Sequence, residues 1–255
     1  MLFFQSKVID TTKCRGRYLR TLPDDLLHAL LTIECEHALF EIIVSLARDL
    51  GFEHCCYGLR MPLPLTQPKI ALFNNYPIVW QQRYQEMNYL AVDPTVQHGI
   101  RSLLPVVWSD DLFAPAPELW EDARSCGLQI GWAQASRDAN CVGGLLTLAR
   151  SIELISKAEL QCKEVKMTWL SQVAHLGMSR LLATKMLPEA GIQLSAREIE
   201  VLQWTGDGKT SSEVSYLLNI SERTVNFHIG NAMTKLNAAN KAAAVVRAAV
   251  LGMLY

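Results

Sequence analysis

The sequence predicts an α+β fold: an N-terminal α/β/α sandwich with a central antiparallel sheet, followed by a C-terminal all-α helix-turn-helix domain of four helices. Two observations support this prediction. Short β-type segments alternate with helical ones as far as residue 150, which is typical of a sheet packed between layers of helices. After that point the pattern contains only helix signals, and no strand is expected in the last quarter of the chain.

In the N-terminal part, apolar periodicity indicates the helices and strands, and glycine and proline indicate where they end. We expect helices over residues 21–51, 77–88, 94–103 and 116–126. We expect strands over residues 52–60, 70–73, 105–108, 131–136 and 143–150. The segment 61–68 contains three prolines and is expected to be a loop.

A long helix should follow from Ser156, which with Glu159 has the pattern of a capping box, to Met186. Its buried face is expected to carry the apolar residues Val165, Trp169, Val173 and Leu176. Two more capping boxes open the next helices, and single caps open the last two. These caps are Ser195 with Glu198, Thr210 with Glu213, Ser221, and Asn240.

Composition limits the class of protein. The chain has 255 residues, 50% of them hydrophobic, and a net charge of −1, so no global charge indicates nucleic acid. No apolar run is long enough to span a membrane, and no membrane partner is expected. The 7 cysteines lack paired spacing, which favours reduced thiols in the cytoplasm and predicts neither a disulfide framework nor a metal site.

A short helix, a three-residue turn at 219–221 and a longer helix have the spacing of a DNA-reading helix pair. One face of the longer helix is apolar and should be buried: Val225, Ile229, Ala232 and Leu236. The opposite face should read bases in the major groove: Arg223, Asn226, Phe227, Gly230 and Thr234. Phosphates should be held by Lys209, Thr210, Lys235 and Lys241. A plain helical bundle with a solvated face would show a similar pattern.

The C-terminal segment resembles the LuxR-type helix-turn-helix family over about 60 residues. The resemblance lies in Leu194, Ser195, Ala196, Arg197, Glu198, Leu202, Gly208, Lys209, Thr210, residues 220–228, Lys235 and Leu236. It implies base-reading positions at Asn226, Phe227 and Gly230.

Residues 36–186 resemble the autoinducer-binding domain of quorum-sensing receptors. The resemblance lies in residues 75–84, Tyr89, Asp93, Pro94, Gly99, Trp108, Trp120, Gly131 and residues 147–150. No acidic pair or phospho-accepting aspartate of a response regulator is found.

This second resemblance implies an N-acyl-homoserine lactone as ligand, with no cofactor. The implied contacts with its polar groups are Asp93 to the amide N–H, Trp80 to the lactone carbonyl, and Tyr76 with Thr147 to the acyl carbonyl. The implied walls are Trp108 under the ring, Tyr84, Trp120, and Cys56 at a small-residue position. Aromatic residues at helical spacing are also typical of an ordinary core, and an aspartate before proline is also typical of a helix cap.

Together the two resemblances imply a cytoplasmic, ligand-dependent transcription regulator that binds double-stranded DNA as a homodimer, with RNA polymerase as partner if it activates. The expected segments are a possible flexible arm at 1–20, a ligand-binding domain at 21–186, a linker at 187–193 and a DNA-binding domain at 194–255.

Two other hypotheses stay open. One is an orphan or ligand-independent LuxR-type repressor or antagonist. The other is a lactone-cleaving enzyme, for which His54 and Cys55 are the only tempting pair of catalytic residues. Neighbouring residues of a strand point to opposite faces, so this pair should not form a dyad, and we expect no catalytic residues and no enzyme.

Overall fold

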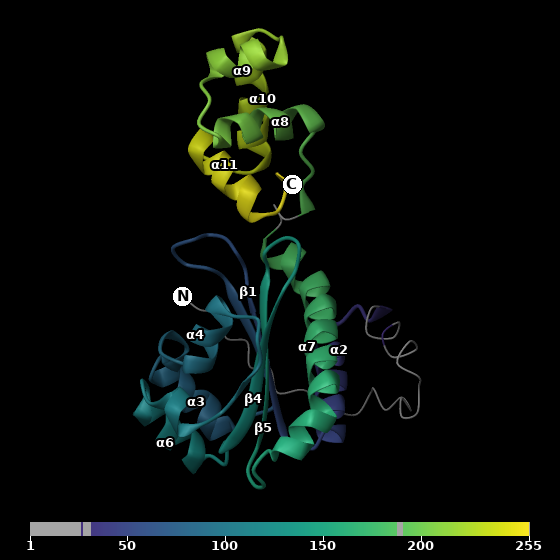
Figure 1. Ribbon diagram of the computed structural model, residues 1–255, viewed down its shortest axis with the longest axis vertical. Helices are drawn as coiled ribbons and strands as arrows, with labels where there is room; N and C mark the ends of the chain where they lie inside the picture. The colour runs from purple at the N-terminus through teal and green to yellow at the C-terminus, as the bar shows by residue number, and fades with distance from the viewer. Residues whose placement is uncertain (1–26, 28–31, 188–190, 255) are drawn as a thin grey trace. The chain divides into compact units, whose positions relative to one another are not determined.

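The computed structural model describes residues 27, 32–187 and 191–254, which form two compact units (Figure 1). One unit holds residues 70–137 and 143–181 together with the described residues before 61. The other holds residues 182–255 together with the segments 61–69 and 138–142. The arm predicted at 1–20 lies outside the described residues.

The first unit, here the sheet unit, is built on five antiparallel strands in the order β2-β1-β5-β4-β3. The strands are β1 (His54–Arg60), β2 (Ile70–Asn74), β3 (Val106–Val107), β4 (Ile130–Arg137) and β5 (Gly143–Arg150). These are the five strands that the sequence predicts, with ends that differ by one or two residues.

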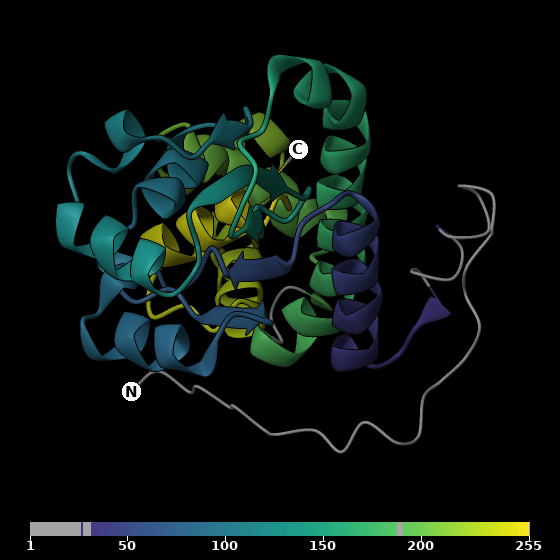
Figure 2. The same ribbon diagram turned by 90° about the horizontal axis from the view of Figure 1, so that it is seen from below.

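Helices cover both faces of the sheet. Helices α2 and α7 lie side by side on one face, and α3, α4 and α6 cover the other (Figures 1 and 2). The predicted α/β/α sandwich is therefore confirmed. The helices of this unit are α2 (Glu36–Asp49), α3 (Ile78–Glu86), η1 (Tyr89–Ala91), α4 (Pro94–Arg101), α5 (Asp110–Phe113), α6 (Pro117–Ser125) and α7 (Lys157–Met186).

The helix predicted over 21–51 is wrong as a single element. Residues 33–35 are not helical, and α2 begins only at Glu36, after Cys35 in extended backbone. Two short elements, η1 and α5, were not predicted. The start of α5 is fixed by Ser109, whose hydroxyl accepts a hydrogen bond from the Leu112 N–H at 3.2 Å.

The predicted buried face of α7 is wrong in part: Val173 is buried, as predicted, but Val165 and Leu176 are not. Val165 is 79% exposed and Leu176 is 51% exposed, whereas Met167 and Ala174 are buried against the sheet. The buried face carries polar residues as well, and these have hydrogen-bond partners on the sheet. The Ser171 hydroxyl lies 3.1 Å from that of Ser136, so hydropathy alone could not identify this face.

Glu159 ties α7 to the sheet. Its backbone N–H donates to the Ser156 hydroxyl at 3.1 Å, as the predicted cap requires. Its carboxylate, however, accepts two hydrogen bonds from Arg150 of β5, at 2.9 and 2.8 Å, and one from Lys163 at 2.8 Å. These hydrogen bonds lower the pKa of Glu159 to about 2, so the carboxylate stays charged and paired.

The second unit, here the helical unit, contains the four predicted helices. They are α8 (Ala196–Gly206), α9 (Ser211–Leu218), α10 (Glu222–Lys235) and α11 (Lys241–Val250). Both predicted capping boxes are present, and Ser221 and Asn240 cap α10 and α11 through their side chains. The helices meet around a small core of Val201, Val214, Val225 and Ile229.

Candidate ligand site and DNA-reading surface

An aromatic cluster lies between the sheet and helices α3 to α6. Its buried aromatic members are Trp80, Tyr89, Phe113 and Trp120, and its half-buried ones are Tyr76, Tyr84 and Trp108. All five aromatic residues predicted as ligand contacts are therefore in this one cluster, although they are spread over 45 residues of sequence, from Tyr76 to Trp120.

The sheet beneath the cluster carries small side chains. Cys56 of β1, Thr147 of β5 and Ala133 of β4 are neighbours in register, so their side chains share one face of the sheet. The glycine at 131 is required by Trp108, because a Cβ there would come within 2.3 Å of the indole ring. Two of the predicted ligand contacts, Cys56 and Thr147, thus lie on the sheet face that the aromatic helices cover.

Asp93 is held in place by three hydrogen bonds. As N-cap of α4, its Oδ1 accepts from the backbone N–H of Thr95 at 2.8 Å and from the Thr95 hydroxyl at 2.7 Å. Its Oδ2 accepts from the Tyr84 hydroxyl at 2.9 Å. The backbone N–H of Val96 also acts on this carboxylate. A carboxylate oxygen has two lone pairs, and Oδ2 accepts one hydrogen bond, from Tyr84, so a further donor at Oδ2 is compatible with the cap role.

Burial shapes the ionisation of this site. It raises the pKa of Asp93 above its ordinary value, against the opposing effect of the hydrogen bonds from Thr95. Burial, with the neighbouring Asp93 charge, also raises the pKa of Cys56 to about 12, and burial raises the pKa of Tyr76 well above its usual range. Cys56 and Tyr76 are therefore neutral, and Tyr76 keeps its hydroxyl proton for donation.

One side of the cluster is fixed by ring stacking and by carboxylates at its rim. Phe113 stacks on Trp120 with 4.4 Å between ring centroids and 3° between planes. The Trp120 indole N–H donates to Asp110 at 2.7 Å, and the Tyr89 hydroxyl donates to Asp122 at 2.6 Å. Trp120 has thus already used its one donor, which leaves its ring as a wall.

Sequence reasoning assigned no role to Thr95, Tyr89 or Phe113. Tyr89 was part of the family pattern, which was the available signal. Phe113 lies in α5, where Ser109 followed by two acidic residues has the pattern of a helix start that could have been recognised. Thr95 binds Asp93 only because the chain turns at Pro94, and a local pattern of this kind is common at helix starts.

The proposed catalytic pair is not assembled. In β1 the side chains of His54 and Cys55 point to opposite faces of the sheet, as the alternation of burial along the strand indicates. Cys55 is fully buried, and burial raises the pKa of its thiol well above the usual range. A buried neutral thiol is a poor nucleophile, so this pair gives no basis for lactone cleavage.

In the helical unit, α10 has the two faces that the sequence predicts. The four apolar residues predicted to be buried are all buried: Val225, Ile229, Ala232 and Leu236. The five predicted base-reading positions are all exposed: Arg223, Asn226, Phe227, Gly230 and Thr234. The Asn226 side chain accepts a hydrogen bond from the Ser211 hydroxyl of α9 at 2.9 Å, which orients it on this face.

Lys235 has a structural partner that the sequence did not reveal. Its ammonium group lies 2.7 Å from the carboxylate of Glu198, which is nearly fully buried at the start of α8. Burial acts to raise the pKa of Glu198, but the hydrogen bonds from Lys235 and Ser195 outweigh it, and the pKa is lowered. This ion pair joins the start of α8 to the end of α10.

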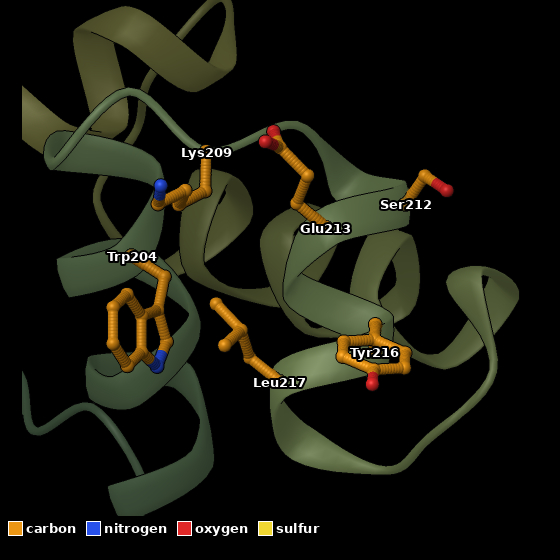
Figure 3. A pocket seen from close by; sticks show the side chains of 6 residues that line it. All are labelled: Trp204, Lys209, Ser212, Glu213, Tyr216 and Leu217. Atoms are coloured by element: carbon orange, nitrogen blue, oxygen red, sulfur yellow. The ribbon is translucent and has the colours of Figure 1, made fainter.

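A groove of about 510 Å³ lies between α8 and α9 (Figure 3). Trp204 and Lys209 line one side of it, and Tyr216 of α9 lines the other. Tyr216 is 88% exposed. Of the residues predicted to contact DNA, only Lys209 lines this groove, so the groove is separate from the exposed face of α10.

A sheet unit with an aromatic cluster and a half-buried carboxylate beside it, followed by a helix-turn-helix unit, indicates the class of ligand-sensing transcription regulators. The autoinducer binding domain model matches residues 36–178, and the model for bacterial regulatory proteins of the luxR family matches residues 192–248. The chain therefore belongs to the LuxR family of autoinducer-dependent transcriptional regulators.

Individual relatives agree with this assignment. The chain is 47% identical to the transcriptional activator protein SolR of Ralstonia solanacearum, over 90% of this chain and 98% of SolR. It is 45% identical to the transcriptional activator protein AnoR of Acinetobacter nosocomialis, over 91% of this chain and 98% of AnoR.

A solved structure of SdiA, the regulatory protein of Escherichia coli, in complex with octanoyl-rac-glycerol superposes with a TM-score of 0.78 at 35% identity, covering 91% of this chain and 95% of that one. These relatives are regulators and not enzymes, which argues against the lactone-cleaving hypothesis. Among the helices that the structure describes, none has the length and apolarity needed to cross a membrane.

We expect Asp93→Asn to stabilise the ligand-free protein at neutral pH. A raised pKa means that the folded state disfavours the charged carboxylate, so the contribution of Asp93 to stability falls as pH rises through and above its ordinary pKa of 3.8. Asparagine caps helices well and carries no charge. Melting curves between pH 4 and 8 should show an advantage of the variant that grows with pH.

The matched control is Asp122→Asn, for which the opposite sign is expected. Hydrogen bonds from Tyr89 and Arg83 lower the pKa of Asp122, so this carboxylate stabilises the fold above its ordinary pKa and loses that effect on acidification. A loss of stability in Asp93→Asn that is largest at pH 7 would contradict the burial argument.

Proposed function

We propose that this protein binds an N-acyl-homoserine lactone in the sheet unit and, as a homodimer, recognises an inverted-repeat DNA site to control quorum-sensing genes. The observation that carries the proposal is the environment of Asp93: a half-buried carboxylate whose Oδ2 accepts one hydrogen bond, from Tyr84 of the aromatic cluster. Such a group binds a neutral ligand that offers an N–H, because an unpaired buried acceptor costs about 1–3 kcal/mol.

The ligand has one polar group for each predicted contact. Asp93 accepts the amide N–H, the Trp80 indole N–H donates to the lactone carbonyl, and Tyr76 donates to the acyl carbonyl. The aromatic rings Tyr84, Trp108 and Trp120 form the walls around the lactone, while Cys56 and Thr147 lie on the sheet beneath. Part of the surface of Tyr76, Tyr84 and Asp93 is accessible, yet burial raises the pKa of all three groups. This combination supports an enclosed space beside them.

The chemistry of a relative's ligand suggests a suitable test compound. SdiA has been solved with an octanoyl ester of glycerol. An eight-carbon chain is therefore the first to try here, as N-octanoyl-homoserine lactone.

In the helical unit, the exposed face of α10 reads bases. Arg223 pairs with guanine, Asn226 with adenine, and Phe227, 62% exposed, contacts a thymine methyl group. Lys209, Thr210 and Lys241 hold phosphates, and Lys235 does so while paired with Glu198. The relatives SolR and AnoR are transcriptional activators, which supports activation through RNA polymerase. The protein would act in the cytoplasm, where the DNA lies.

The homodimer is supported by charge and by an exposed stripe on α7. Residues 193–255 contain six Lys and Arg against five Asp and Glu, so one copy neutralises few phosphates. The stripe lies on the side of α7 opposite its buried face. Its members follow one another at spacings of four or three residues: Val165, Trp169, Gln172 and Leu176. This α7 stripe matches a helix-to-helix contact with a second copy.

The signal should stabilise the protein and switch on its DNA binding. A ligand that binds only the native state adds about 2.7 kcal/mol at 100 times its dissociation constant. We expect a higher melting temperature with N-octanoyl-homoserine lactone, together with selection of an inverted repeat from a random DNA pool. The control is open-chain N-octanoyl-homoserine, whose carboxylate would lie near Asp93. Equal stabilisation by both compounds, or selection of the same DNA without any signal, would refute the proposal.

A charge on the α7 stripe should separate the two copies. Val165→Glu buries a carboxylate in the proposed dimer contact, so we expect a monomer in analytical ultracentrifugation and at least about tenfold weaker binding to the inverted repeat. Lys166→Gln, exposed on the same helix but off the stripe, should stay dimeric. A dimeric Val165→Glu with normal DNA affinity would exclude this surface.

A further inference from the structure

The fold of this chain does not require a glycine at position 230 of α10. It lies in the interior of α10, between Asn226 and Thr234 on the exposed face. Glycine in a helix interior costs about 1 kcal/mol relative to alanine. A Cβ at Gly230 would meet no atom within 4 Å beyond its own helix.

Two other glycines in helices have a packing reason. At Gly99 of α4 a Cβ would lie 3.2 Å from Leu145 and 3.3 Å from Ala135. At Gly206, the last residue of α8, it would lie 3.2 Å from Val245. A side chain at position 99 or 206 would have to move a neighbour, whereas a side chain at position 230 would not. The reason for glycine at position 230 therefore lies outside the folded chain.

We propose that Gly230 is the point where the backbone of α10 comes against the DNA, and that its missing side chain sets how deeply the helix enters the major groove. The inference rests on the proposed DNA-binding function. Asn226, one turn earlier on the same face, has a short side chain and reaches a base edge only if the helix backbone lies close to it. Any side chain at position 230 would hold the helix away and weaken every base contact on this face.

The inference predicts opposite effects on the fold and on binding. Gly230→Ala should slow amide hydrogen exchange in α10 of the full-length protein by about fivefold, because alanine stabilises the helix. The same variant should bind DNA at least about fivefold more weakly, and Gly230→Leu more weakly still. The probe is the duplex that the wild-type protein selects from a random pool in the presence of N-octanoyl-homoserine lactone, with affinity measured by fluorescence anisotropy.

Asn231→Ala is the matched control. It raises helix propensity one residue away, on a different side of α10, so exchange should slow while DNA affinity stays at the wild-type value. Wild-type affinity in Gly230→Ala would overturn the inference and leave the proposed function intact. Failure of the wild-type protein to select any duplex would overturn both.

Discussion

The proposed recognition of a ligand in the sheet unit depends on one carboxylate, that of Asp93. A buried carboxylate is expensive unless donors surround it, and Thr95 and Tyr84 supply three hydrogen bonds to it. Burial still raises its pKa, which means that these donors do not fully replace water. The proposed role of a ligand amide N–H is to supply a further donor to this carboxylate.

The two faces of the sheet differ in their side chains and in what packs on them. On the face beneath α2 and α7, the side chains of Tyr57, Leu59 and Trp132 are fully buried, and the Glu159 ion pair fastens α7 to β5. On the other face Cys56, Thr147 and Ala133 are small, and aromatic residues on short helices pack over them. Ring contacts and rim carboxylates connect those helices, so the proposed ligand would add to their packing.

Much of this organisation could be predicted from the sequence, because strands and caps have local signals. The five strands, the two capping boxes and the two faces of α10 follow from residue alternation, cap spacing and helical period. The buried face of α7 could not be predicted in this way, because it mixes Met167 with Ser171, whose hydroxyl finds its partners, Ser136 and the Gln134 carbonyl, on strand β4. The pairs between Lys235 and Glu198 and between Tyr89 and Asp122 join residues far apart in sequence, so no local pattern indicates them.

The central claim is that Asp93 recognises an N–H of the signal, and an isosteric pair of ligands tests it most directly. Isothermal titration calorimetry can compare N-octanoyl-homoserine lactone with the octanoyl ester in which oxygen replaces the amide N–H. The two compounds share the lactone, both carbonyls and the chain. We predict that the amide binds about 5- to 150-fold more tightly, which corresponds to about 1–3 kcal/mol for an unpaired buried acceptor. Equal affinities for the amide and the ester would contradict the account.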